Sequence, residues 1–324
     1  MGRLLPSDPV TRRWLIRLVG SGVILAGLFW LLPADAIVTS LKAIPPRVFL
    51  AVLVLFLLAH VAAALKWWLL LSRRIAPLLA IRAHFAGLAA NLCLPGAIGG
   101  DTVRAAMAQA AMRDGARVVA AATVDRVIDM VALLTLSGLG LVLIWDGATG
   151  TTAIGAAAVI VLTVIVGMIA LPWLLPLIWQ AFPALPGRGF ALRLADALAG
   201  FAARPGLLAI AFSASVLIQL TLVLLAWWLA RAAGVSVDTG AWIFAWPLAK
   251  IIAVLPVSLN GLGLREATLA GFLTPFGVGA PAVVAAGLVW QVVLFSAGGI
   301  GALVLLVSGM RPAAPTRSRK EECK

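Results

Sequence analysis

Apolar runs of about 20 residues, each long enough to cross a lipid bilayer as a helix, recur along almost the whole chain. Charged residues make up only 11% of the sequence, whereas a soluble domain has roughly 25%. We therefore expect an all-α polytopic membrane protein, with residues 1–324 forming a single membrane domain. The expected full spans are about six in number, at residues 14–32, 47–71, 118–145, 152–178, 206–230 and 282–308.

Two further apolar segments, residues 76–112 and 240–275, are each interrupted by proline and glycine near the middle. Residues 94–104 and 255–265 share Leu-Pro, a later Gly, an aliphatic residue and a final Arg, at a constant offset of 161 residues. We expect each segment to form a broken re-entrant hairpin, the alternative being two additional crossings. Paired broken segments in the two halves of a membrane protein indicate inverted repeats and a substrate site near the bilayer midplane.

The positive charges outside the apolar segments predict a topology, because Lys and Arg accumulate in cytoplasmic loops. Six crossings place 17 of the 25 basic residues in the cytoplasm, and only Lys42, Arg47 and Arg231 on the other side. Both termini are then cytoplasmic. The first hairpin enters from the cytoplasm and the second from outside, so that residues 47–145 and 206–308 are inverted repeats.

The ends of the chain, residues 1–12 and 311–324, are polar, and we expect flexible cytoplasmic termini there. A cleaved signal peptide is an alternative for the start, because Ala34-Asp35-Ala36 follows the first apolar run. The net charge of +13 suits a cytoplasmic surface that contacts anionic lipid headgroups. Nucleic acid is not an expected partner, because the chain has no soluble basic domain to carry it.

Two features are expected to lie at the membrane surface. Residues 189–204 predict a short interfacial helix with one apolar face, formed by Phe190, Leu194, Leu198 and Phe201. Most of the tryptophans, including the pairs at 67–68 and 227–228, fall near the ends of expected spans. Tryptophans at such positions are typical interfacial anchors.

Ionisable residues inside the apolar segments are costly, at least about 2.5–3.5 kcal/mol for a charge at the bilayer centre, so they should pair or face water. Such cations and carboxylates include Arg104, Arg126, Lys250, Arg265, Asp101, Asp125, Asp129 and Glu266. Asp125 and Asp129 share one helical face, so a cation or a proton should lie between them. Simple pairing that fixes the hairpins to the spans is the alternative to a functional role.

Arg104 and Arg265 differ from the other charges because they recur at equivalent positions in the two broken motifs. Each lies beside a Gly-rich break, where free backbone N–H groups can hold an anion. The planar guanidinium fork suits bidentate binding of a lipid phosphodiester. We therefore expect both arginines to bind the phosphate of a travelling lipid.

The motifs resemble those of a known family. Residues 91–104 read Asn-Leu-Cys-Leu-Pro-Gly-Ala-Ile-Gly-Gly-Asp-Thr-Val-Arg and are similar to the signature N-x-x-L-P-G-x-x-G-G-D-x-x-R, which Asp125-Arg126 follows as a D-R dipeptide. Residues 256–266 are similar to P-x-S-x-x-G-x-G-x-R-E. The chain resembles the lysylphosphatidylglycerol synthase transmembrane, or flippase-like, family over about residues 10–310. The resemblance implies the substrate-binding residues Asn91, Pro95, Gly99, Gly100, Asp101, Arg104, Asp125, Arg126, Pro256, Ser258, Asn260, Gly261, Arg265 and Glu266.

The resemblance implies lipid translocation, as in the membrane half of the bacterial multiple peptide resistance factor, which moves aminoacylated phosphatidylglycerol. We therefore expect flipping of a phosphate-containing lipid across the bacterial inner membrane. The full-length resistance factor adds a cytosolic domain that aminoacylates the lipid, and we expect this chain, whose sequence runs to Lys324, not to hold that reaction. We expect no enzymatic activity and no cofactor, since there is no P-loop, and no metal, since His60 and His84 lack partners at ligand spacing.

Other function classes stay open. A membrane-embedded transferase acting on polyprenyl-phosphate or aminoacyl lipids would need a catalytic carboxylate pair, for which Asp101 with Asp125 is the candidate. A small-solute transporter is the third class. The expected partners are the lipid substrate and the bilayer, and a second copy of the chain would make a homo-oligomer.

Overall fold

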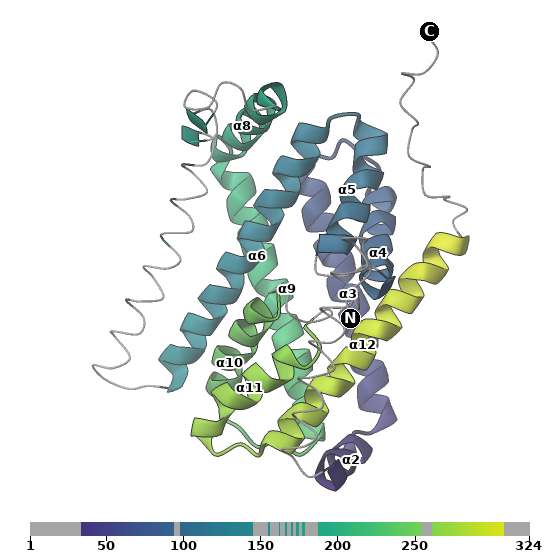
Figure 1. Ribbon diagram of the computed structural model, residues 1–324, viewed down its shortest axis with the longest axis vertical. Helices are drawn as coiled ribbons and strands as arrows, with labels where there is room; N and C mark the ends of the chain where they lie inside the picture. Colours follow the sequence, from purple (N-terminus) through teal and green to yellow (C-terminus); the bar gives the residue numbers. More distant parts are fainter. Residues whose placement is uncertain are drawn as a thin grey trace, which may run out of the picture.

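The computed structural model describes residues 34–93, 98–144, 187–254 and 261–307, with isolated positions between 155 and 178. All regular secondary structure in these ranges is helical, as expected (Figure 1). The elements are α2 (Ala34–Ala43), α3 (Pro46–Leu70), α4 (Pro77–Cys93), α5 (Ile98–Met112), α6 (Gly115–Ile144), α8 (Arg188–Ala202), α9 (Pro205–Ala232), α10 (Thr239–Ile252), α11 (Leu264–Leu273), η1 (Thr274–Phe276) and α12 (Ala280–Val307). The expected span 14–32, nearly all of 152–178 and both expected termini lie outside the described residues.

Four of the described helices, α3, α6, α9 and α12, are long and apolar enough to cross a membrane. They coincide with four of the expected spans. Proline begins α3 at Pro46 and α9 at Pro205. Proline suits this position because the first N–H groups of a helix have no intrahelical acceptor. The chain is thus a multi-pass helical membrane protein.

Each broken segment forms two short helices, α4 and α5 in the first and α10 and α11 in the second. At about 1.5 Å per residue, α4 is roughly 25 Å long and α11 roughly 15 Å, both shorter than a hydrocarbon core of about 30 Å. Figure 1 shows α4 and α5 toward the end of the molecule that carries α8, and α10 and α11 toward the end that carries α2. The expected helix-break-helix form is present in both segments.

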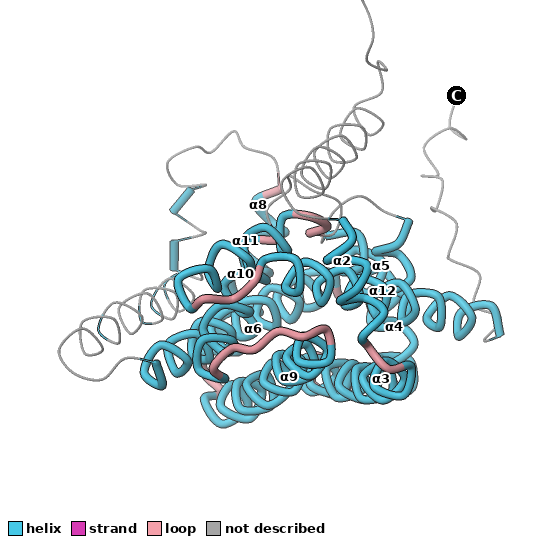
Figure 2. The backbone as a smooth tube through the Cα atoms, turned by 90° about the horizontal axis from the view of Figure 1, so that it is seen from below, coloured by secondary structure: helices cyan, strands magenta, loops and turns pink. Residues whose placement is uncertain are grey.

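The helices of the two halves pack in a matching order. The first long helices, α3 and α9, lie side by side (Figure 2). Helix α4 packs on α12, and its counterpart α10 packs on α6, so the last long helix of each half supports the hairpin of the other. Likewise α5 contacts α6 where α11 contacts α12, and α3 contacts α4 where α9 contacts α10.

Two glycines allow the closest of these contacts. A Cβ at Gly140 in α6 would overlap the backbone nitrogen of Phe244 in α10, and a Cβ at Gly301 in α12 would overlap the backbone oxygen of Phe85 in α4. Ser137 adds a hydrogen bond from its hydroxyl to the carbonyl oxygen of Phe244, at 2.9 Å. Small residues let membrane helices approach closely enough for such backbone contact.

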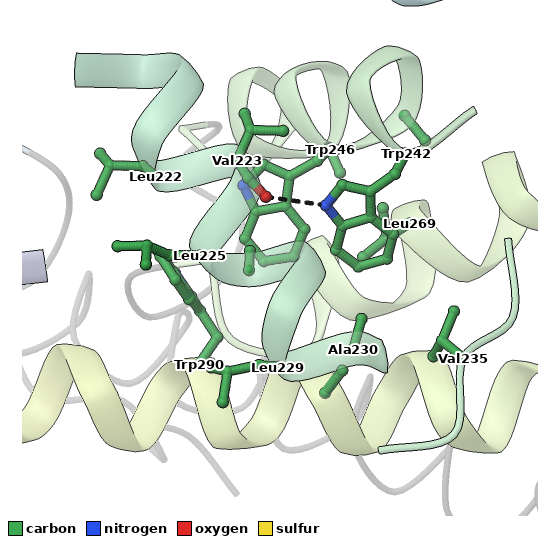
Figure 3. Close-up of a cluster of buried hydrophobic side chains, with 14 of the residues drawn as sticks. Leu222, Val223, Leu225, Leu229, Ala230, Val235, Trp242, Trp246, Leu269 and Trp290 are labelled. Atoms are coloured by element: carbon green, nitrogen blue, oxygen red, sulfur yellow. Dashed lines mark hydrogen bonds between the residues drawn. The ribbon is translucent and has the colours of Figure 1, made fainter. Parts of the chain in front are cut away.

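A cluster of tryptophans fills the core between α9, α10 and α12 (Figure 3). Trp242 and Trp246 stack with ring centroids 5.2 Å apart, and Trp290 meets Trp246 edge-on at 5.3 Å. Trp242 Nε1 donates to the carbonyl oxygen of Val223 at 3.1 Å, so its polar atom is satisfied inside the core. The expectation that most tryptophans act as interfacial anchors is wrong for these residues and for Trp67, which is also fully buried.

The amphipathic helix expected at 189–204 is present as α8, but its apolar face packs on protein. Helix α8 contacts α6 and α9, and the residues buried there are Ala191, Ala195, Leu198 and Phe201. Phe190, expected on the same face, is 41% exposed. Contacts with α6 and α9 therefore hold this helix against the rest of the protein.

The turns rich in arginine meet at one end of the molecule. Arg74 Nη1, in the turn between α3 and α4, lies 3.7 Å from Asp114 in the turn between α5 and α6. Arg204, between α8 and α9, donates to Ser72 Oγ at 3.3 Å. Helix α2, with Lys42 in its last turn, lies at the other end (Figure 1). The arginine-rich turns and Lys42 thus lie at opposite ends of the long axis of the molecule.

Candidate functional site

A buried ion-pair network joins helices of the first half. Arg104 Nη2 of α5 lies 2.9 Å from Asp125 Oδ2 of α6. Asp125 Oδ1 lies 3.0 Å from Lys66 Nζ of α3, which also lies 2.5 Å from Asp129 Oδ1. Ser215 of α9 hydrogen-bonds to Lys66 at 2.7 Å and to Asp129. Lys66 is therefore the cation expected between the two carboxylates that share a face of α6.

A second ion pair, between Arg126 and Asp101, is more accessible. Arg126 donates from Nε and Nη2 to the two carboxylate oxygens of Asp101, at 2.6 and 2.5 Å, in a bidentate arrangement. The Arg126 side chain is 51% exposed, whereas that of Arg104 is 6% exposed. Asp101 also lies 3.5 Å from Arg104 Nη2, so one carboxylate connects the accessible arginine to the buried one.

Two histidines extend this network on the side of α3 and α4. His60 Nδ1 and His84 Nε2 are 2.9 Å apart, and His84 Nδ1 lies 3.5 Å from Arg104 Nη1. Because an arginine can only donate, His84 Nδ1 must accept, and its Nε2–H then donates to His60 Nδ1. Both imidazoles are neutral in this arrangement. The two histidines are 24 residues apart in the sequence, and no motif indicated that their rings meet.

The second hairpin has its own ion pair. Arg265 Nη2 contacts Glu266 Oε1 at 2.6 Å, the Gly287 carbonyl oxygen at 3.2 Å and Gln291 Oε1 at 3.3 Å. Glu266 Oε2 accepts from the backbone N–H of Gly263 at 2.8 Å, at the N-terminus of α11. A Cβ at position 287 would lie 2.5 Å from Glu266 Cγ, so glycine makes room for the buried carboxylate.

Lys250, in the last turn of α10, is bound differently. Its Nζ donates to the side-chain oxygen of Gln219 in α9, at 2.7 Å. Within the described part of the chain it forms no ion pair, whereas Lys66, Arg104, Arg126 and Arg265 each do. The charges that act on it include Asp129 and Arg126 of the first half and Arg265 of the second. Lys250 is therefore within electrostatic range of both networks.

The two arginines of the broken motifs have similar surroundings. Arg104 and Arg265 are each 5% exposed, and each guanidinium lies over a tryptophan ring, 4.6 Å from the centroid of Trp67 and 5.7 Å from that of Trp246. The Nε atom of each is buried without an acceptor among the described residues. Both guanidinium groups are bound to carboxylates, which occupy positions where the sequence led us to expect a phosphate.

Several of the other expected site residues shape the backbone. The Gly100 N–H donates to Asn91 Oδ1 at 2.8 Å, and a Cβ at Gly100 would lie 2.6 Å from that oxygen, so this contact fastens α4 to α5. Gly99 lies beside it in the first turn of α5. Gly261 has a φ of +78° and approaches Ala253 closely, a conformation that favours glycine.

The motifs alone did not identify every member of the networks. The members they missed are His60, Lys66, His84, Ser215, Gln219 and Gln291. A polar residue inside an apolar segment is the signal that could have found them. Four expected site residues, Pro95, Pro256, Ser258 and Asn260, lie outside the described residues. Where the structure describes the chain, it shows no group of His, Cys, Asp and Glu suited to a metal ion.

Comparison with known families tests the resemblance seen in the motifs. The family described as the lysylphosphatidylglycerol synthase TM region matches residues 14–301. The match includes both broken segments and almost all of the long helices, and it confirms the family expected from the sequence. No curated protein matches the chain.

Proposed function

The chain belongs to the lysylphosphatidylglycerol synthase transmembrane family, and we propose that it translocates a phosphate-containing lipid across the bacterial inner membrane. The observation that carries this proposal is the accessible Arg126–Asp101 pair, with Arg104 beside the same carboxylate. Phosphodiesters bind a guanidinium fork in the same bidentate way as carboxylates. A lipid phosphate can therefore replace Asp101 on Arg126 without leaving the guanidinium unpaired in an apolar phase.

Exchange of partners gives the phosphate a route inward. Asp101, once displaced from Arg126, is already 3.5 Å from Arg104 and can pair with it more closely. The headgroup then moves along the charged residues while the acyl chains stay in the bilayer. Each step replaces one anion by another on a cation, so no bare charge is created at membrane depth.

In this proposal the two halves, residues about 47–145 and 206–308, are inverted repeats that rock against each other to give alternating access. The matching order of helix packing supports it. So does the spacing of Gly140 and Gly301, which is 161 residues, the same as that of the two broken motifs. The hairpins α4–α5 and α10–α11 are re-entrant, since each of their helices is shorter than the bilayer core, and six spans cross the membrane.

The proposed orientation has both termini in the cytoplasm. The arginine-rich turns around Arg74, Asp114 and Arg204 gather at one end of the molecule, as the positive-inside rule requires of a cytoplasmic face. The α4–α5 hairpin then enters from the cytoplasm and the α10–α11 hairpin from the opposite side.

We favour transport without chemical change of the lipid. A transferase would use Asp101 and Asp125 as its carboxylate pair, but each is held by an arginine, Asp101 by Arg126 and Asp125 by Arg104. Both carboxylates are therefore engaged in ion pairs rather than free to act on a bound lipid.

The test uses purified protein in vesicles that contain a fluorescent phospholipid, with a membrane-impermeant quencher to report the outer leaflet. Arg126→Gln should slow lipid movement about tenfold or more, the size of one lost charge-assisted hydrogen bond. Arg193→Gln, on the exposed face of α8, is the matched control and should keep the wild-type rate. Mass analysis of the lipids should find them unmodified. Wild-type rates in Arg126→Gln, or a new lipid product, would overturn the proposal.

A further inference from the structure

The membrane-embedded charges of the described residues do not balance. Apart from Arg82, which lies in the second turn of α4 close to the arginine-rich turns, five are cations and four are carboxylates, namely Lys66, Arg104, Arg126, Lys250 and Arg265 against Asp101, Asp125, Asp129 and Glu266. The histidine pair adds no charge, because His84 accepts from Arg104 and donates to His60. These nine groups therefore carry one net positive charge.

The excess charge belongs to Lys250. Each of the four other cations has a carboxylate oxygen within 3.0 Å. Lys250 instead contacts the neutral amide of Gln219, at 2.7 Å. An ammonium group without a counter-charge is expensive at membrane depth. An anion supplied from outside the protein would therefore stabilise this arrangement.

The position of Lys250 suits a travelling anion. It lies on α10, which packs on both α6 and α9, and the charges that act on it are the carboxylate of Asp129 and the cations Arg126, Arg265 and Lys66. Arg126 is the accessible cation at which we propose that the phosphate first binds. Among the nine groups counted above, Lys250 is the cation that lacks a carboxylate of its own.

We propose that Lys250 holds the headgroup phosphate between the two hairpins, and that the site selects lipids with one net negative charge. This inference rests on the proposed function and names its substrate class: phosphodiester lipids whose headgroup carries no cation. A monoanion cancels the excess charge. A zwitterionic lipid brings no net charge, and a dianionic phosphomonoester would reverse the imbalance.

Binding can be measured apart from transport. Thermal unfolding of the full chain in detergent is followed with a short-chain phosphatidylglycerol or a short-chain phosphatidylcholine, since a ligand of the folded state raises the unfolding temperature. The monoanionic lipid should bind wild type about tenfold more tightly or better, the value of one charge-assisted hydrogen bond. Lys250→Gln should remove this preference. Lys42→Gln, on the exposed surface of α2, is the control and should keep it.

A second variant tests the charge without removing the lysine. Gln219→Glu places a carboxylate where the amide oxygen now lies 2.7 Å from Lys250 Nζ. This internal counter-charge should abolish the preference for the monoanionic lipid while the protein stays folded. Gln219→Met, which has similar volume and no charge, should retain the preference. If Lys250 is merely structural, Gln219→Glu will bind both lipids as wild type does, and the inference is overturned.

The outcomes separate this inference from the function it rests on. If wild type binds the monoanionic lipid preferentially but moves no lipid in vesicles, the proposed function fails and the binding site stands. If wild type moves lipid but binds both headgroups equally, the charge selection fails and translocation stands.

Discussion

Gly140 and Gly301 lie 161 residues apart and make the same kind of contact, each letting a long helix touch the backbone of a hairpin from the other half. Gly140 brings α6 against α10 at Phe244, and Gly301 brings α12 against α4 at Phe85. Each hairpin is therefore carried by a helix of the opposite half. If one half rocks against the other, each hairpin must move together with the long helix that carries it, or these contacts must break.

The first prediction concerns these close contacts. Gly301→Val should destabilise the protein by about 1–3 kcal/mol, because the new side chain overlaps the Phe85 backbone and must push α12 away from α4. Gly299→Val, two residues earlier, is the matched control, since a Cβ there meets nothing within 4 Å. Thermal unfolding in detergent compares the two. Equal unfolding temperatures would contradict close packing of α12 on α4.

The second prediction concerns Lys66. Lys66→Met should destabilise the protein by about 3–5 kcal/mol, because it strands a buried carboxylate charge on α6. Asp125 keeps Arg104 as a partner, whereas Asp129 keeps only the hydroxyl of Ser215 among the contacts seen here. Adding Asp129→Asn should therefore restore a large part of the loss.

Protein abundance and unfolding temperature measure the effect. Lys42→Met, which removes an exposed lysine from α2, controls for the general effect of the substitution and should behave as wild type. If the double variant is no more stable than Lys66→Met alone, Lys66 and Asp129 do not form the ion pair described.

The long helices could be predicted from the sequence because their length and polarity are local properties. The charge partners could not, because they depend on which helices meet. Arg104 has Asp101 one turn before it, yet its shortest contact is with Asp125 on α6. Arg265 instead pairs with its neighbour in the chain, Glu266. Two arginines at equivalent motif positions thus have different kinds of partner, which the motifs do not encode.

The candidate site was predicted in part. The motifs identified the arginines and every carboxylate of the networks except Asp129, but neither Lys66, which pairs with it, nor Lys250, which contacts Gln219 instead. Those lysines lie on α3 and α10, where the surrounding residues carry no motif. The tryptophans were also predicted wrongly. Trp67 stands near the end of a span, which suggested an interfacial anchor, but its ring lies under the Arg104 guanidinium. Tertiary contacts between distant helices decide both cases.

The third prediction concerns topology. Single cysteines near Arg188, where α8 begins, and near Gly277, after η1, should be labelled from opposite sides of the membrane. Cys93 and Cys323 are first replaced by alanine. A membrane-impermeant maleimide should label the position near Gly277 in intact cells, and the position near Arg188 only after permeabilisation. Labelling of both from one side would contradict the crossing number and the opposed hairpins.

The last prediction separates arginines that need the guanidinium fork from those that need only a charge. In the contacts seen here, Arg126 binds Asp101 through two nitrogens, Nε and Nη2, whereas Arg265 serves Glu266, Gly287 and Gln291 through Nη2 alone. An ammonium group has three donors on one nitrogen and cannot reproduce the parallel fork. It can, however, replace a single nitrogen that serves several acceptors.

Arg126→Lys should therefore lower the rate of lipid movement about tenfold, whereas Arg265→Lys should remain close to wild type in both rate and abundance. The measurement is outer-leaflet exposure of a fluorescent phospholipid in vesicles, normalised to the amount of folded protein. A large loss in Arg265→Lys at normal abundance would show that this arginine also grips the headgroup through its fork, as its place in the broken motif first led us to expect. Wild-type rates in both variants would mean that neither fork binds phosphate, and that the arginines hold the hairpins in place.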